Sequence, residues 1–188
     1  MYELSVVASM LLLNAINPSE PFETKVEMMT KSKTLNNLQT ALAMELTATH
    51  QYQLHAGVLD DWGMDLLATQ MRTELQEELA HSEAFMVRIL FLKGEPKMEF
   101  AKSPTRAKSL KAMFELDSKD EKEAIVFYSQ ASVQAAADGD IGTRQLFERI
   151  AIEEEQHMSW LELQLDLLER MGEPAYIAKH MPTPGAAS

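Results

Sequence analysis

Four long segments with almost no glycine or proline dominate the sequence and restrict the choice of fold. In residues 34–62, 65–93, 104–138 and 140–171, apolar side chains recur at steps of three and four, the period of one face of an α-helix. Helices of about 28 to 35 residues extend roughly 40 to 50 Å, so they bury their apolar faces best against one another. No alternating β-branched run bounded by a hairpin turn occurs. The sequence therefore predicts an all-α protein built as a four-helix bundle.

Turn residues separate the four segments. Gly63 marks a short turn after the first helix, and Asp138–Gly139–Asp140 reads as a turn that ends in the N-cap of the fourth. The stretch 94–104 contains two prolines and is long enough to cross the length of a bundle, so the third helix is expected to run parallel to the second. We expect this helix to begin near Ser103–Pro104 and a short fifth helix to follow Pro174.

These boundaries divide the chain into an N-terminal extension (1–33), the bundle domain (34–181) and a C-terminal tail (182–188). The extension contains an apolar run, Val6–Ile16, which is too short to span a bilayer. A secretory signal has Lys or Arg before its apolar run and small residues at a cleavage site after it. Here Glu3 precedes the run and Pro18 follows it. We therefore expect a soluble, cytoplasmic protein with no membrane partner.

Composition excludes several classes of function. The sequence has no cysteine, which rules out disulfides, iron–sulfur clusters and thiolate metal sites, so a bound metal must use oxygen or imidazole ligands. Its 29 acidic and 17 basic residues give a formal charge of −12. This charge argues against a nucleic-acid partner, because phosphate binding needs a basic surface. An acidic chain is better suited to binding cations.

Two of the predicted helices contain the same pattern, Glu-x-x-His. It occurs as Glu78 and His81 in the second helix and as Glu154 and His157 in the fourth. Residues three apart lie on the same helical face, so each carboxylate and imidazole can share a metal. In both helices that face is the apolar one. Burying several carboxylates together is costly unless something positive lies among them.

The other two helices each supply one further glutamate on the apolar face. Glu45 is the only acidic residue between Thr34 and Asp60, and Glu121 lies two turns from both Phe114 and Tyr128. One Glu from each of two helices and Glu-x-x-His from the other two form the ligand set of di-iron and di-manganese carboxylate proteins. The predicted metal ligands are Glu45, Glu78, His81, Glu121, Glu154 and His157.

Other ionisable residues compete for these roles. Glu115 and Glu123 are alternatives to Glu121. Glu121 is favoured because it precedes Glu154 by 33 positions, the same spacing by which Glu45 precedes Glu78. We interpret the remaining histidines as surface or packing residues, and four further glutamates as solvated or cavity-facing charges. The histidines are His50, His55 and His180, and the glutamates are Glu74, Glu77, Glu153 and Glu155.

From about Thr34 to Ile177 the sequence resembles the bacterioferritin branch of the ferritin-like superfamily. The matching strings lie in the first helix and the turn after it, at the end of the second helix and along the fourth. They are Gln51–Tyr52, Asp61–Trp62–Gly63, Arg88–Gly94, Glu154–His157, Trp160–Glu162, Leu165–Leu168 and Met171–Gly172.

The resemblance implies a ferroxidase centre that binds two iron ions per subunit, or manganese, and oxidises Fe(II) to Fe(III) with oxygen or peroxide for iron storage or detoxification. It assigns Glu78 and Glu154 as bridging ligands and the other four residues as terminal ligands. Tyr52 matches a tyrosine that hydrogen-bonds a ligand carboxylate. A homo-oligomer is implied, from a dimer to a shell of 24 subunits. The alternative is a ferritin-like di-metal oxidase or peroxidase that stores no iron.

One departure from the family concerns haem. Bacterioferritins bind haem between subunits through a methionine immediately after the glutamate of the second helix, where this sequence has Leu79. A leucine side chain cannot coordinate iron, and Met71 and Met86 are not expected to replace that methionine. We therefore do not expect haem.

Overall fold

The computed structural model describes residues 22–181, with side chains from residue 33 onward, and these residues form five helices and no strands. The predicted apolar run Val6–Ile16 and the tail 182–188 lie outside the described residues. The helices are α2 (Phe22–Asp61), α3 (Asp65–Phe91), α4 (Leu110–Ala137), α5 (Ile141–Met171) and α6 (Glu173–His180). The predicted four-helix bundle with a short C-terminal helix is confirmed.

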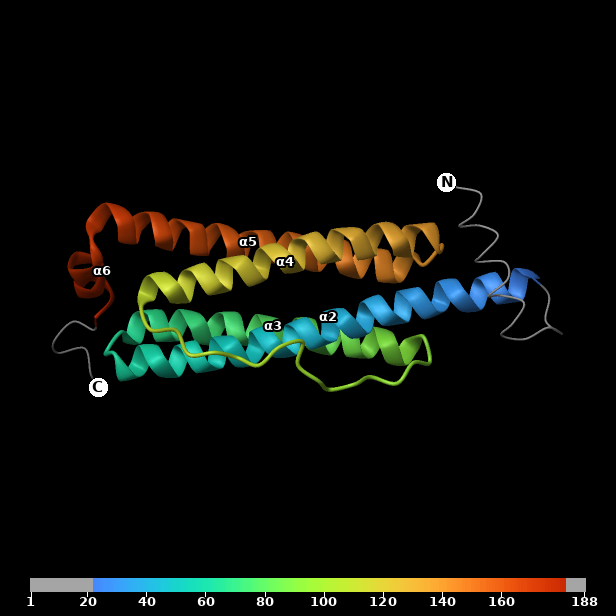
Figure 1. Ribbon diagram of the computed structural model, residues 1–188, viewed down its shortest axis with the longest axis horizontal. Helices are drawn as coiled ribbons and strands as arrows, with labels where there is room; N and C mark the ends of the chain where they lie inside the picture. The colour runs from blue at the N-terminus through green and yellow to red at the C-terminus, as the bar shows by residue number, and fades with distance from the viewer. Residues whose placement is uncertain (1–21, 182–188) are drawn as a thin grey trace.

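The bundle consists of two antiparallel pairs, α2 with α3 and α4 with α5 (Figure 1). Gly63 has a φ of 76° in the turn that joins α2 to α3, a conformation that favours glycine. The connection from α3 to α4 crosses the length of the bundle along α2, so α4 runs parallel to α3, as predicted (Figure 1). Asp140 is the N-cap of α5, since its Oδ1 accepts a hydrogen bond from the backbone N–H of Thr143 at 2.9 Å.

The first helix of the bundle begins earlier than predicted. The helical pattern predicts a start at Thr34, whereas α2 starts at Phe22. Residues 22–34 contain no glycine or proline, so nothing in them stops the helix from extending. The division between an extension and the bundle at residue 33 is therefore not a break in secondary structure.

The start of α4 was also predicted wrongly, near Ser103–Pro104. The helix begins at Leu110, where the Ser109 side chain caps it by accepting a hydrogen bond from the N–H of Ala112 at 3.2 Å. The Thr105 backbone is bound instead to Gln51 of α2. The amide oxygen of Gln51 accepts from its N–H at 2.8 Å, and the amide nitrogen donates to its carbonyl at 2.9 Å.

Two side chains nearer the start of α2 hold the rest of the crossover. Gln39 exchanges a similar pair of hydrogen bonds with the backbone of Lys97, at 2.9 and 2.7 Å. The Thr47 hydroxyl accepts from the N–H of Ala101 at 2.9 Å and donates to the carbonyl of Ala43 at 2.8 Å. The crossover is therefore attached to α2 at three points, although it has no regular secondary structure.

Two apolar clusters fill the interior, and a belt of buried polar residues lies between them. The cluster at the α6 end includes Met71, Phe114 and Tyr176, and that at the other end includes Phe85 and Phe147. All four long helices therefore enclose the polar belt.

No helix among residues 22–181 is long and apolar enough to cross a membrane.

Candidate metal centre

The six predicted ligands come together in the polar belt. Each is at most 6% exposed, and they project from all four long helices into the middle of the bundle. Their ligand atoms form two groups of four, and within each group all atoms lie within 4.8 Å of one another. The groups share two residues: one comprises Glu45, Glu78, His81 and Glu154, and the other Glu78, Glu121, Glu154 and His157.

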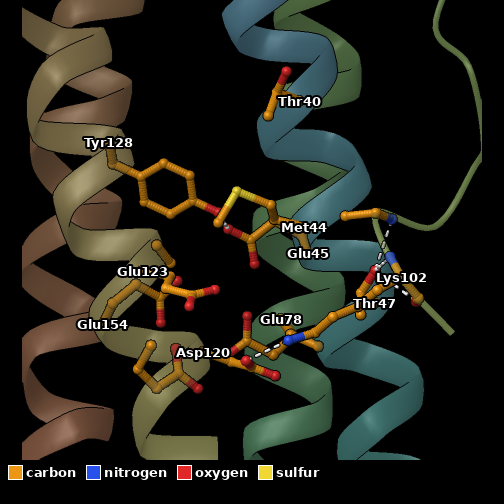
Figure 2. A pocket seen from close by; sticks show the side chains of 14 residues that line it. Thr40, Met44, Glu45, Thr47, Glu78, Lys102, Asp120, Glu123, Tyr128 and Glu154 are labelled. Atoms are coloured by element: carbon orange, nitrogen blue, oxygen red, sulfur yellow. Dashed lines mark hydrogen bonds and ion pairs between the residues drawn. The ribbon is translucent and has the colours of Figure 1, made fainter. Parts of the chain in front are cut away.

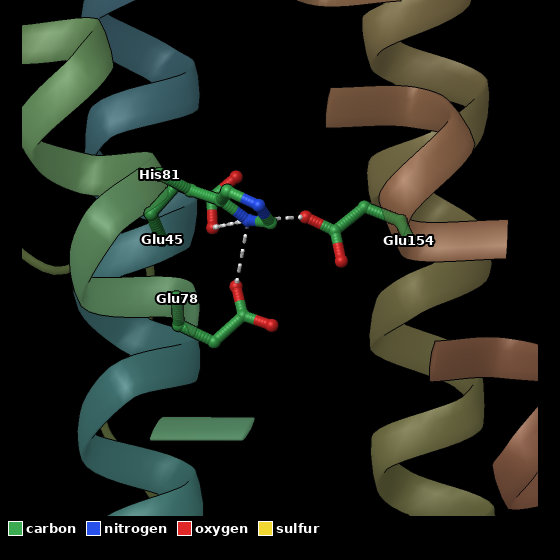
Figure 3. A group of neighbouring side chains, drawn as sticks. All are labelled: Glu45, Glu78, His81 and Glu154. Atoms are coloured by element: carbon green, nitrogen blue, oxygen red, sulfur yellow. Dashed lines mark ion pairs between the residues drawn. The ribbon is translucent and has the colours of Figure 1, made fainter. Parts of the chain in front are cut away.

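The two histidines point their Nδ1 atoms toward the shared carboxylates. Figure 3 shows the first group, in which His81 Nδ1 lies 3.0 Å from Glu154, 3.6 Å from Glu78 and 3.7 Å from Glu45. In the second group, His157 Nδ1 lies 3.1 Å from Glu78 and 2.9 Å from Glu154. Glu78 and Glu154 therefore face both imidazoles, as ligands that bridge two metals must.

Several of these polar atoms have no hydrogen-bond partner although they are buried. They are both oxygens of Glu154, one oxygen of Glu78, and the Nδ1 atoms of His81 and His157. Leaving buried polar atoms unpaired costs free energy, so such a cluster requires an explanation. Oxygen and imidazole nitrogen donors around an enclosed point suit iron or manganese. The residues present fit a pair of such ions.

Two glutamates at the edge of the belt orient the histidines. His81 Nε2 donates to Glu153 at 3.0 Å, and His157 Nε2 donates to Glu77 at 2.9 Å. A proton held on Nε2 leaves the Nδ1 lone pair free for a metal, which is the usual arrangement around metal-binding histidines. Glu77 and Glu153 were predicted as solvated or cavity-facing charges, and their contacts with the histidines were not predicted.

Two tyrosines hydrogen-bond the two carboxylates that were predicted to be terminal ligands. Tyr52 donates a hydrogen bond to Glu121, and Tyr128 donates one to Glu45. Tyr52 thus contacts one of the carboxylates predicted to be metal ligands, whereas the contact of Tyr128 was not predicted. The signal was present in the sequence, because 76 residues separate Tyr52 from Tyr128, just as they separate Glu45 from Glu121. The same offset relates Glu77 to Glu153 and one Glu-x-x-His to the other.

Comparison with known proteins identifies the family of the chain. Residues 35–171 match the ferritin-like domain family. A bacterioferritin of Brucella melitensis biotype 1 is 37% identical over 79% of this chain and 92% of its own length. The chain belongs to the bacterioferritin branch of the ferritin-like family.

Solved bacterioferritins have the same fold as this bacterioferritin-type chain. The Rhodobacter capsulatus protein, described with a metal-free dinuclear site and a heme iron, has a TM-score of 0.80 and 32% sequence identity. That similarity covers 83% of this chain and 98% of the other. For Mycobacterium tuberculosis BfrA the TM-score is 0.78 and the identity 34%, over 80% and 95% of the two chains.

At the haem position this bacterioferritin-type chain has Leu79, which lies on an exposed part of α3 and is 47% exposed. Its side chain offers no donor atom. The absence of haem remains a prediction from this residue.

The alternative candidates for the ligand roles lie outside the two ligand groups. Glu115 and Glu123 are exposed and pair with Lys111 and Lys119 on the surface of α4. None of the other three described histidines belongs to either group. His50 and His180 bind backbone carbonyls, and the fully buried His55 binds Asp117 at 2.9 Å.

Glu74 differs from its predicted role as a solvated or cavity-facing charge. It is only 5% exposed, and its Oε2 has no hydrogen-bond partner. One of its oxygens lies 3.2 Å from His157 Nε2, beside the contact from Glu77. The 76-residue offset places Ile150 in the corresponding position of the other half. The two halves of the site are therefore not equivalent around their histidines.

Burial and mutual repulsion shift the acidity of these groups. Burial, and then the charge of Glu78, raise the pKa of Glu45 and of Glu121 well above the usual range. Burial alone would lower the pKa of His157, but its contacts with Glu154 and Glu78 outweigh it and raise the pKa to about 12. The pKa of His81 is raised in the same way, chiefly by Glu154. Without metal, protons therefore supply positive charge in the centre.

A cavity of about 340 Å³ leads to this centre between α2, α4 and the crossover (Figure 2). Four of the carboxylates line it, namely Glu45, Glu78, Glu121 and Glu154. Its outer part is lined by Lys102, Asp120 and Glu123. The centre is thus buried by the helices and accessible to a small ion from one side.

Proposed function

We propose that this chain is a di-iron ferroxidase that oxidises Fe(II) to Fe(III) with oxygen or peroxide and stores the product as ferric iron. The observation that carries this proposal is the pair of ligand groups that share Glu78 and Glu154. Two adjacent irons can together supply two electrons to an oxidant, which is the chemistry that the bound metals would provide. Its bacterioferritin relatives support storage as the purpose.

In this proposal each residue has a defined task. Glu78 and Glu154 would contribute oxygens to both metal positions, Glu45 and His81 would complete one position, and Glu121 and His157 would complete the other. Four carboxylates balance the four positive charges of two Fe(II) ions. Tyr52 and Tyr128 fix the terminal carboxylates, and Glu77 and Glu153 hold the histidines with Nδ1 turned inward.

Iron loading combined with size-exclusion chromatography tests storage. We expect a large assembly, such as a 24-subunit shell, that takes up hundreds of irons per particle when Fe(II) is added in air. The competing function is a di-metal oxidase or peroxidase that stores no iron. A dimer that saturates at two metals per chain would contradict storage and favour that alternative. The cytoplasmic location is likewise proposed from the relatives.

Metal binding should release protons. The pKa values of Glu45, Glu121, His81 and His157 are all raised, which favours the protonated forms of these groups, and a cation must displace the protons that they hold. Raising the pH lowers the cost of that displacement, so affinity should increase by up to about tenfold per pH unit for each proton released. Calorimetric titration with Co²⁺ in buffers of different ionisation enthalpy measures the protons released. Affinity that is constant between pH 6 and 8 would contradict the assignment.

A further inference from the structure

One lysine crosses the mouth of the cavity that leads to the centre. Six acidic residues line this cavity, and among the residues lining it only Lys102 is basic. Figure 2 shows its side chain extending from the crossover toward α4, where the ammonium group pairs with Asp120. Asp120 immediately precedes the proposed ligand Glu121. A positive charge therefore stands between solvent and the buried carboxylates.

The backbone that carries this lysine is fixed. The neighbouring Ala101 N–H donates to the Thr47 hydroxyl at 2.9 Å and to the carbonyl of Ala43 at 3.1 Å. Farther along, Thr105 is held by both ends of the Gln51 amide. The Lys102 side chain can therefore turn away from the mouth by rotation about its own bonds, while the crossover backbone stays in place.

The ion pair itself is suited to opening. The Lys102 side chain is 47% exposed and that of Asp120 is 21% exposed, so solvent screens their attraction. A lysine has a long, flexible stem and a single point charge, so it can leave its partner without disturbing other contacts. Once it leaves, Asp120 and Glu123 present negative charge at the mouth.

We propose that Lys102 is a cationic gate that controls how fast divalent cations reach the metal centre. In the closed position its ammonium group repels the cation and occupies Asp120. In the open position Asp120 takes the cation and passes it toward Glu121. This inference rests on the proposed function only in requiring that the centre binds divalent cations.

The test measures metal binding without oxidation chemistry. Stopped-flow mixing of metal-free protein with Co²⁺ reports the rate from the visible absorption of the bound ion. Lys102→Gln should bind Co²⁺ about threefold to tenfold faster at low ionic strength, because one repulsive charge has left the path. The increase should largely disappear at 1 M salt, where charges are screened within about 3 Å. Lys102→Arg keeps the charge and should bind at the parent rate.

A matched control separates a gate from a general change in charge. Lys97 lies on the same crossover and is exposed, and it does not line the cavity, so Lys97→Gln removes the same charge elsewhere. Equal acceleration in the Lys97 and Lys102 variants, or none in either, would overturn the gate. If Co²⁺ binds and the variants differ as expected while Fe(II) is never oxidised, the ferroxidase proposal fails and the gate stands.

Discussion

Replacing Glu78 with alanine should abolish the rapid oxidation of Fe(II). Glu78 belongs to both ligand groups, so this one substitution removes a ligand from each metal. A lost ligand costs several kcal/mol of charge stabilisation, which corresponds to a rate at least about a hundredfold lower. Absorbance of the ferric product after aerobic addition of Fe(II) measures this rate.

Two further variants make the result specific. Glu78→Gln keeps the shape of the side chain and should lose activity to the same degree. That result would exclude lost side-chain volume or misfolding as the cause. Glu83→Ala removes a carboxylate from the exposed face of the same helix and should keep the parent rate. Rapid oxidation retained in the Glu78 variants would show that the centre has been misplaced.

Divalent metal should stabilise the fold strongly. A ligand at a hundred times its Kd contributes about 2.7 kcal/mol per site, so two sites contribute about 5 kcal/mol. For a chain of this length, each kcal/mol raises Tm by about 2–4 °C. We therefore expect Co²⁺ to raise Tm by about 10–20 °C, measured by circular dichroism at fixed protein concentration.

The same experiment on Glu45→Gln should give two changes of opposite sign. Burial raises the pKa of Glu45, which means that its charged form is unfavourable in the metal-free fold. A neutral amide of the same shape should raise the metal-free Tm while greatly reducing the shift produced by Co²⁺. Glu115→Gln, on the exposed surface of α4 and outside the cavity, should change neither. A Co²⁺ shift as large in Glu45→Gln as in the parent would contradict the ligand assignment.

The sequence predicted most of the fold because its helices are long and its apolar pattern is regular. The same pattern identified Glu45 and Glu121, since a carboxylate on an apolar helical face has to be buried. The boundaries were predicted less well. The start of α4 depends on Gln51 binding the backbone of Thr105, a contact between residues that are distant in sequence.

The residues that surround the centre were harder to predict than the six residues that meet in it. Glu77 and Glu153 sit beside buried residues on their helices, and their contacts with His157 and His81 cross from one helix to another. Tyr128 has the ordinary appearance of a buried aromatic residue until the 76-residue offset relates it to Tyr52. The ion pair at Lys102 depends on where the irregular crossover lies, which helical periodicity does not specify.

The most direct test of the central claim is a crystal structure of the protein soaked with iron or manganese, with anomalous scattering used to locate the ions. Two peaks about 3.5–4 Å apart are expected, each within bonding distance of both Glu78 and Glu154. One peak should also contact Glu45 and His81, and the other Glu121 and His157. A single peak, or metal bound only by Glu74 and Glu77, would contradict the account.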